Sequence, residues 1–423
     1  MKTRIRRFLF HLNSFITRHQ IISGLVLTIL LLLLIELTTR LLEGEFSPFT
    51  PEYFQYNPHT LWDNKPEFSF TKQTGAGTVR FQTNQYGFRA REFQKEKPPA
   101  TTRIFCLGDS TTWGYDIPFE AIYPERLNQR LGEQVQVISA GVMGYTIAQC
   151  RIQLETKLLA FHPDIITVAS NYNDRRYTLE KYSFEDPESL SRLYSTRRFI
   201  DFLSRISHTV HYIIQFSMNQ MFENLRKNPP PLDTLTCRVP LEHYRQNLEQ
   251  ICRIAHANDI KVVFIGMGDS YQNFSFLREY RTASTLDEKI SILLNARREQ
   301  SAGVYGLATR LLVEHLKASA GQDSGIRAEE IERVYPLRRS LDGGFIIEPD
   351  WVYRDAMAEV AEQHQIPWLD FVQYTMQFDE IKNLRTSIFI EDDPAHLNEL
   401  GHSLLADALE PILQQIIHEK TLR

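Results

Sequence analysis

The chain has 423 residues, 43% of them hydrophobic, which is enough for one large domain or two medium ones. Its formal net charge of −5 comes without any basic block, which argues against a nucleic-acid-binding protein. Four cysteines without a Cys-x-x-Cys pair argue against a disulfide scaffold and a zinc cluster, and we predict that Cys106 and Cys150 are small core residues.

The N-terminus joins a basic segment to a long apolar run. Residues 1–19 hold five lysine or arginine residues and no acidic residue, and a leucine-rich stretch follows at residues 20–42. As a helix this stretch is roughly 30 Å long, about the thickness of a bilayer core, with Glu36 and Arg40 near one interface. We predict a single transmembrane helix with a cytoplasmic N-terminus and the rest of the chain outside, in a bacterial periplasm or at the cell surface. A cleaved signal peptide is the alternative, which the missing small-x-small site after the run disfavours.

A short lead-in and then an α/β pattern follow the apolar run. Residues 43–102 are rich in Pro, Tyr, Phe and Thr and alternate like strands and turns, which predicts a lead-in packed on the main domain. From residue 103 to about residue 420, short apolar strands alternate with amphipathic helices, which predicts a mainly parallel sheet covered on both faces. Helical insertions are expected at about 176–240 and 272–362. The strands are expected at 103–108, 135–141, 165–170, 260–268 and 366–372.

Two Gly-Asp-Ser triplets compete for the role of a nucleophile. One ends at Ser110 and the other at Ser270, and both follow an apolar strand. Ligands of open α/β sheets bind beyond the carboxyl ends of the strands, so position alone does not separate the two serines. A nucleophilic serine also needs a base and hydrogen-bond donors for the oxyanion.

The best candidate base is His396. It is the only one of the thirteen histidines with an aspartate three residues earlier, Asp393, and a carboxylate on the same turn can hold the tautomer of the imidazole. On spacing alone, a surface acidic loop with a helix-capping histidine fits equally well. A metal site made of Asp393, His396 and His402 is disfavoured, because the His-Glu-x-x-His arrangement is missing.

Four segments in this order resemble the SGNH hydrolase superfamily, also called GDSL-type esterases. They are GDSTTWG at 108–114, AGVMGYT at 140–146, NYND at 171–174 and DPAHLNELGH at 393–402. The resemblance covers about residues 103–413, and the segments at 83–92 and 241–266 also fit extracytoplasmic members. It implies a three-layer α/β/α sandwich of flavodoxin-like topology that needs no metal and no organic cofactor.

Carried over position by position, the resemblance assigns a catalytic triad. Ser110 is the nucleophile, His396 is the base and Asp393 orients the base. Ser270 then has no assigned role and is expected to be a turn at the edge of the cleft. Trp113 and Tyr115, which follow the nucleophile, fit packing better than stacking on a sugar ring.

The resemblance also assigns three oxyanion donors: the backbone N–H of Ser110, the backbone N–H of Gly144 and the side-chain amide of Asn173. Gly141 is the rival alignment for the second donor. Asn171 stands where the family often has glycine, which leaves the local backbone open. Glycine suits such a place because no Cβ keeps the substrate oxygen away.

The expected function is that of a serine esterase that removes ester-linked acyl groups through an acyl-enzyme. The predicted location favours O-acetyl groups of cell-envelope or extracellular polysaccharide as substrate, with the bilayer as a second partner through the N-terminal helix. An O-acyltransferase using the same triad and a catalytically silent envelope assembly or binding protein remain alternatives. No substrate-binding residue and no oligomeric state follow from the sequence.

Overall fold

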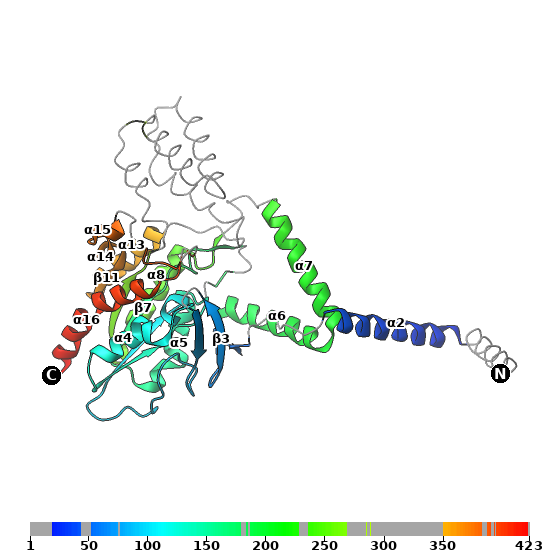
Figure 1. Cartoon of the computed structure of the whole chain (residues 1–423), viewed down its shortest axis with the longest axis horizontal. Helices are drawn as coiled ribbons and strands as arrows, with labels where there is room; N and C mark the ends of the chain where they lie inside the picture. Colours follow the sequence, from blue (N-terminus) through cyan, green and yellow to red (C-terminus); the bar gives the residue numbers. More distant parts are fainter. Residues whose placement is uncertain are drawn as a thin grey trace. The chain divides into compact units, whose positions relative to one another are not determined.

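Figure 1 shows the computed structural model of the chain, which describes residues 19–43, 52–74, 77–178, 183–184, 187–227, 236–268, 285, 288, 350–382, 387–390, 393 and 395–421. The chain divides into two compact units. The first comprises Met1–Pro51 and Ser195–Asn224, and the second comprises Glu52–Tyr194 and Leu225–Arg423.

A five-stranded parallel sheet forms the centre of the second unit. Its strands are β5 (Thr102–Gly108), β6 (Val135–Ser139), β7 (Ile165–Ala169), β10 (Lys261–Gly266) and β11 (Trp368–Asp370). Their order across the sheet is β11-β10-β7-β5-β6, and every pairing is parallel. The strand of this sheet that comes first in the chain, β5, therefore lies between β6 and β7, so the order of the strands reverses direction across the sheet at β5. This is the flavodoxin-like order, whose ligands bind at the carboxyl ends of the strands beside that change.

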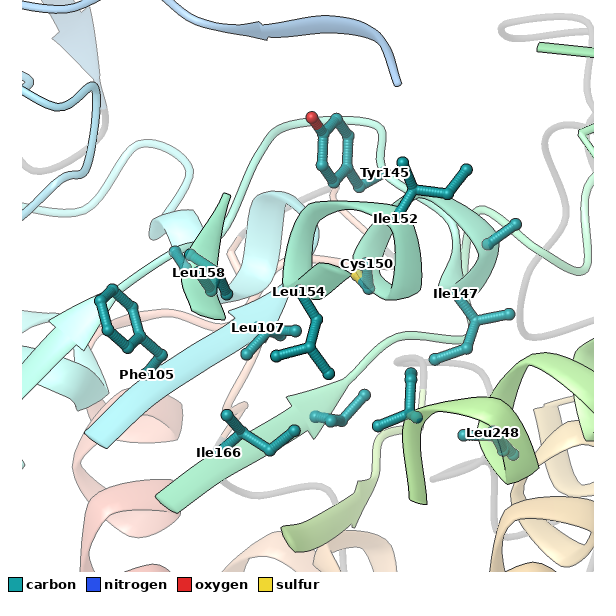
Figure 2. Packing of buried hydrophobic residues seen from close by; sticks show 14 of the residues in the cluster. Phe105, Leu107, Tyr145, Ile147, Cys150, Ile152, Leu154, Leu158, Ile166 and Leu248 are labelled. Carbon is teal, nitrogen blue, oxygen red and sulfur yellow. The ribbon is translucent and has the colours of Figure 1, made fainter. Parts of the chain in front are cut away.

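Both faces of the sheet are covered by helices, because the strands are apolar on both sides. Phe105 and Leu107 of β5 belong to one core with α5 (Ile147–Thr156), α8 (Leu241–Ala257) and α13 (Asp350–Gln363). Figure 2 shows Leu154 of α5 above this face, with Ile166 of β7 beside it. Ile104 and Cys106 of β5 belong to a second core with α4 (Tyr123–Arg130) and α16 (Glu399–Thr421). The predicted α/β/α sandwich is confirmed.

Short elements connect these layers. They are α3 (Ser110–Trp113), η1 (Phe119–Ala121), η2 (Leu158–Phe161), β8 (Tyr177–Thr178), β9 (Thr236–Cys237), α14 (Phe371–Thr375) and α15 (Asp379–Lys382). Cys106 and Cys150 are buried free thiols, as predicted. Most of the second expected insertion, at about 272–362, lies outside the described residues.

The lead-in forms two antiparallel hairpins. One pairs β1 (Phe54–Asn57) with β2 (Leu61–Asn64), and the other pairs β3 (Ser69–Thr74) with β4 (Gly77–Gln82). All four residues of β2 are buried. The lead-in is thus part of the core of the second unit and contacts the loops of the candidate site described below.

The first unit is helical. It contains α2 (Gln20–Glu43), the second half of α6 (Pro187–Ile206) and most of α7 (His208–Lys227). The stretch Gln20–Leu41 of α2 has a mean hydropathy of 2.6, and none of its side chains is buried. By length and composition it can span a membrane, a property that membrane anchors and signal sequences share.

Candidate active site

The first Gly-Asp-Ser triplet forms a tight strand-to-helix turn. Ser110 is the first residue of α3, directly after β5. The Asp109 carboxylate caps this helix by accepting a hydrogen bond from the Thr111 N–H at 2.9 Å. A Cβ at Gly108 would lie 2.1 Å from Oγ1 of Thr112 and 2.6 Å from the carbonyl oxygen of the adjacent β7, so this position requires glycine. The turn therefore presents Ser110 at the carboxyl end of the central strand.

Ser110, His396 and Asp393 form a continuous hydrogen-bonded chain. The His396 Nε2 lies 2.7 Å from the Ser110 Oγ, and its Nδ1 lies 2.7 Å from Oδ2 of Asp393. Oδ1 of Asp393 accepts hydrogen bonds from the backbone N–H groups of Ala395 and His396, at 2.8 and 3.1 Å. The spacing of three residues thus folds the carboxylate back onto its own turn. These three side chains were singled out from the sequence, and the structure brings them together.

The Asp393 carboxylate is stabilised in its ionised form. Burial by itself would raise its pKa, but hydrogen bonds and the charge interaction with His396 outweigh burial, and the pKa of Asp393 is lowered. A carboxylate that stays ionised accepts the Nδ1–H of His396, which leaves Nε2 as the proton acceptor facing Ser110. The competing Ser270 and its Asp269 lie outside the described residues.

An aromatic ring supports the imidazole from one side. Tyr115 stacks on His396, with ring centroids 4.4 Å apart and planes 29° apart. Lys72 of the lead-in donates a hydrogen bond to the Tyr115 hydroxyl at 3.1 Å and pairs with Asp116 at 2.7 Å. Sequence analysis missed this role of Tyr115, because no local pattern links it to residues 72 and 396. Trp113, in contrast, is buried and packs in the interior.

The glycine loop after β6 contains both candidate oxyanion glycines, and they differ in their surroundings. A Cβ at Gly141 would lie 2.4 Å from the backbone nitrogen of Trp113, so close packing explains this glycine. Gly144 has φ +81°, a left-handed conformation that glycine adopts without strain. The Val142 N–H donates to the carbonyl oxygen of Gly108 at 3.1 Å, which ties the loop to the end of β5.

The lead-in fixes the backbone of this glycine loop. The Trp62 indole N–H donates to the Met143 carbonyl at 3.0 Å, and the Asn64 amide donates to the Gly141 carbonyl at 3.0 Å. The Tyr145 hydroxyl donates to the Trp62 carbonyl at 2.8 Å. These bonds hold two loop carbonyls on the lead-in side. Sequence analysis predicted a packed lead-in but none of these residues.

Asn173 lies beside the nucleophile turn with its amide orientation fixed. Its Nδ2 donates to Oδ2 of Asp109 at 3.2 Å, and its Oδ1 accepts from Arg176 at 3.3 Å. Asn173 is buried, and one of its two N–H bonds is directed to Asp109. Asn171 fills the family's glycine position and donates to the Met267 carbonyl at 2.8 Å, which joins this turn to the end of β10. That bond gives a physical reason for asparagine at this position.

A buried carboxyl group lies behind the same turn. Asp174 accepts hydrogen bonds from the Ile147 N–H at 2.8 Å, at the start of α5, and from the Ser170 hydroxyl at 3.1 Å. Burial raises the pKa of Asp174 to about 7. The asparagine block and the helix after the glycine block are therefore connected through one side chain.

Arg89 holds the segment that follows the nucleophile helix. Its guanidinium donates to the carbonyl oxygens of Trp113, Gly114 and Ile117, at 2.7, 2.6 and 2.6 Å. Burial lowers the pKa of Arg89 to about 9. The motif around Arg89 was noted in the sequence, but its contact with residues 113–117 was not predictable from spacing.

His402 is a buried histidine that contributes to packing and lies apart from the candidate triad. Its Nδ1 accepts a hydrogen bond from the Tyr123 N–H at 3.3 Å, its ring stacks on the Tyr123 ring, and burial lowers its pKa to about 3. The folded chain therefore buries the neutral imidazole. Within the part of the chain that the structure describes, no group of three or more His, Cys, Asp or Glu side chains could hold a metal ion.

A family model described as the GDSL-like Lipase/Acylhydrolase family matches residues 106–331, a little over half of the chain. The chain belongs to this family. This GDSL-type enzyme is therefore an ester-hydrolysing serine hydrolase. The matched range includes Ser110, Gly144 and Asn173 and ends before Asp393 and His396.

Solved structures of GDSL-type and related enzymes are similar to this chain at low sequence identity. A lipase/acylhydrolase from Enterococcus faecalis is 14% identical, over 74% of this chain and 96% of that chain, with a TM-score of 0.37. A GDSL-like lipase from Bacteroides thetaiotaomicron is 12% identical, over 75% and 89%, with a TM-score of 0.35. A psychrotrophic esterase from Pseudoalteromonas sp. is 10% identical, over 75% and 99%, with a TM-score of 0.36. No curated protein matches the chain.

Proposed function

We propose that this GDSL-type enzyme is a membrane-anchored serine esterase in which Ser110, His396 and Asp393 form the catalytic triad. The observation that carries the proposal is the unbroken chain of two 2.7 Å contacts from the Ser110 Oγ through the imidazole to Asp393. A nucleophile within hydrogen-bond reach of a base, which a third group orients, is the arrangement that acyl transfer requires.

The reaction has two halves. The His396 Nε2 removes the proton of the Ser110 hydroxyl as the Oγ attacks the ester carbonyl carbon, and the resulting tetrahedral oxyanion collapses to an acyl-enzyme. The alcohol leaves with the proton held by His396. Water, deprotonated by the same nitrogen, then attacks the acyl-enzyme and releases the carboxylic acid and free Ser110.

The proposed oxyanion donors are the backbone N–H groups of Ser110 and Gly144 and the side-chain amide of Asn173. Two facts support Gly144 over Gly141: its left-handed backbone, and the packing that already explains the other glycine. The Asn173 amide donates to Asp109 and its oxygen accepts from Arg176, which fixes the orientation of the amide; its second N–H is the proposed donor to the oxyanion. Each donor is expected to lower the barrier by roughly 3 kcal/mol.

The proposed substrate is an ester-linked acyl group, such as O-acetyl, on a cell-envelope or extracellular polysaccharide. This follows from α2 as a membrane anchor whose preceding basic residues keep the N-terminus in the cytoplasm and the hydrolase outside. With a sugar hydroxyl in place of water, the same acyl-enzyme would give acyl transfer.

Covalent labelling with a fluorophosphonate probe tests the nucleophile. We expect the wild type and a Ser270→Ala control to be labelled and the Ser110→Ala variant to be unlabelled, with a loss on the order of 10⁵–10⁶ in kcat on p-nitrophenyl acetate. Loss of labelling in Ser270→Ala with retention in Ser110→Ala would identify Ser270 as the nucleophile instead. Acylated oligosaccharide as the main product, when an oligosaccharide acceptor is added, would identify a transferase.

A further inference from the structure

Two helices of the first unit expose an unusual amount of apolar surface. The second half of α6 and the first half of α7 each carry a stripe of large apolar side chains at helical spacing, and all of these side chains are more than half exposed. On α6 they are Phe199, Phe202 and Ile206, and on α7 they are Tyr212, Ile213 and Phe216. Contiguous exposed patches of this kind mark an interaction site.

The exposure of this helix pair is inverted with respect to a water-soluble helix. Asp201 and Ser204 of α6 and His211 of α7 are buried, whereas Phe199 and Phe202 beside them on α6 are exposed. Helices on the surface of a soluble domain bury the apolar face and expose the polar one. The first half of α6 follows that rule, because Leu190 and Leu193 belong to the hydrolase core. The inversion begins where α6 enters the first unit.

The junction of α6 and α7 is attached to the apolar helix α2 (Figure 1). The Glu36 carboxylate of α2 accepts hydrogen bonds from the Ser207 hydroxyl at 2.7 Å and from the backbone N–H groups of His208 and Thr209 at 3.0 and 3.1 Å. The Thr209 hydroxyl also donates to the Thr39 hydroxyl at 3.2 Å. These bonds satisfy N–H groups that the first turn of α7 leaves without helical partners.

This attachment determines the depth of the α6–α7 helix pair relative to the bilayer. Glu36 is within the stretch Gln20–Leu41 that can span a membrane. A carboxylate is tolerated at that depth only when its oxygens are satisfied by protein donors. Glu36 lies five residues, or about 7 Å along the helix axis, before Leu41 at the end of the apolar stretch. If α2 spans a bilayer, the start of α7, which is bonded to Glu36, must therefore lie at the edge of the same bilayer.

The charges of the helix pair suit a lipid surface. Residues 187–227 contain six basic and three acidic residues in a chain whose net charge is −5. In a helix of 3.6 residues per turn, Arg198 and Arg205 lie beside the apolar stripe of α6. Amphipathic helices with basic residues next to an aromatic face bind at the boundary of headgroups and acyl chains, preferentially on anionic lipid.

We propose that the α6–α7 helix pair is embedded in the outer boundary of the bilayer that α2 spans, with the phenylalanine-rich stripes facing lipid. The inference rests on the proposed anchoring by α2 and goes beyond it. The enzyme is held to the membrane by a spanning helix and by an interfacial helix pair, and Glu36 joins the two. The occupant of the exposed apolar face is phospholipid, in preference to a second copy of the chain.

Photo-crosslinking of the full chain tests the proposal. The enzyme is reconstituted in phosphatidylcholine–phosphatidylglycerol vesicles containing a diazirine phospholipid, irradiated, digested and mapped by mass spectrometry. We expect lipid adducts on peptides of α2 and on peptides of residues 195–224, and only background on α16, whose exposed face belongs to the hydrolase. Adducts on α2 without adducts on 195–224 would overturn this inference alone. Their absence from α2 as well would overturn the anchoring too, and crosslinks from 195–224 to another copy of the chain would identify a protein interface instead.

A matched pair of tryptophan variants tests which face meets the lipid. All four natural tryptophans lie in the second unit, so a tryptophan added to the helix pair reports separately by difference. In vesicles of brominated lipid we expect the emission added by Phe202→Trp to be quenched. The emission added by Arg197→Trp, an exposed polar position of α6 on the side of the buried Asp201 and Ser204, is expected to be largely kept. Equal emission of Phe202→Trp in brominated and ordinary lipid would refute the orientation.

Discussion

Replacing Asp393 with asparagine changes one atom of the proposed triad and keeps its shape. Oδ1 of residue 393 accepts from two backbone N–H groups, those of Ala395 and His396, so the oxygen of an asparagine side chain takes that position. The amide NH₂ then occupies the place of Oδ2, which lies 2.7 Å from the His396 Nδ1. Two donors would face each other across that distance.

The imidazole relieves this conflict by moving its proton to the other nitrogen. Nδ1 then accepts from the amide, and Nε2 carries a hydrogen that it donates to the Ser110 Oγ, 2.7 Å away. In this tautomer His396 cannot act as the base. The expected loss is on the order of 10⁴ in kcat, equivalent to about 5.5 kcal/mol of activation free energy.

The assay is steady-state hydrolysis of p-nitrophenyl acetate, together with the rate of fluorophosphonate labelling. Glu399→Gln is the matched control, because Glu399 is an exposed carboxylate on the same segment, at the start of α16, and its activity should equal that of the wild type. If Asp393→Asn retains a tenth or more of the wild-type kcat, Asp393 does not set the tautomer of His396, and the proposed role is wrong.

Three further predictions concern residues around the triad. Tyr115→Leu removes the ring stacked on the imidazole and should lower kcat roughly fivefold, equivalent to about 1 kcal/mol of activation free energy. Tyr115→Phe keeps the stacked ring and loses only the hydrogen bond from Lys72, so its kcat should stay near that of the wild type. Equal kcat values for the two variants would argue against a contribution of the stacked ring. Arg89→Met removes the guanidinium donor of three buried carbonyls, and only the Gly114 carbonyl keeps another donor among the described residues, the Ile117 N–H. The free energy of unfolding, measured by urea titration of tryptophan fluorescence in detergent, should fall by roughly 2–6 kcal/mol, and a change below 1 kcal/mol would contradict this. Burial lowers the pKa of His402 to about 3, so the neutral ring contributes fully to the free energy of unfolding above the unfolded pKa of about 6.5, and this contribution is lost as the pH falls. Between pH 8 and pH 5 the free energy of unfolding of the wild type should therefore fall by about 2 kcal/mol more than that of His402→Gln. Parallel pH profiles of the two proteins would show that the ring is not buried in its neutral form.

The sequence predicted those parts of the site that depend on local chemistry. Asp393 and His396 are three residues apart, and one turn of backbone places the carboxylate on the ring, so spacing alone suggested the pair. The strands were predictable for the same reason, since alternation of apolar runs and helices is local. The contacts of Tyr115 with His396 and Lys72 join positions far apart in the chain, and Arg89 acts at a similar distance, so no pattern within one segment identifies them.

The helix pair α6–α7 illustrates a different limit. The sequence predicted a helical insertion at about 176–240, and α6 and α7 lie within that range. Periodicity shows that a helix has two unlike faces, but it does not show which medium covers each face. Only the burial of Asp201 and Ser204 beside exposed Phe199 and Phe202 shows that the usual assignment is inverted.

The hydrogen bond between Ser110 and His396 joins residues 286 positions apart, and the base lies on the turn before the last helix. Ribosomes synthesise Ser110 well before Asp393 and His396, and domains fold as units once their segments are available. The enzyme therefore cannot pair Ser110 with its proposed base until the chain has been synthesised past residue 396. A nascent or truncated chain that ends before this residue carries an inert serine, and we expect hydrolysis only once α16 has packed against α4.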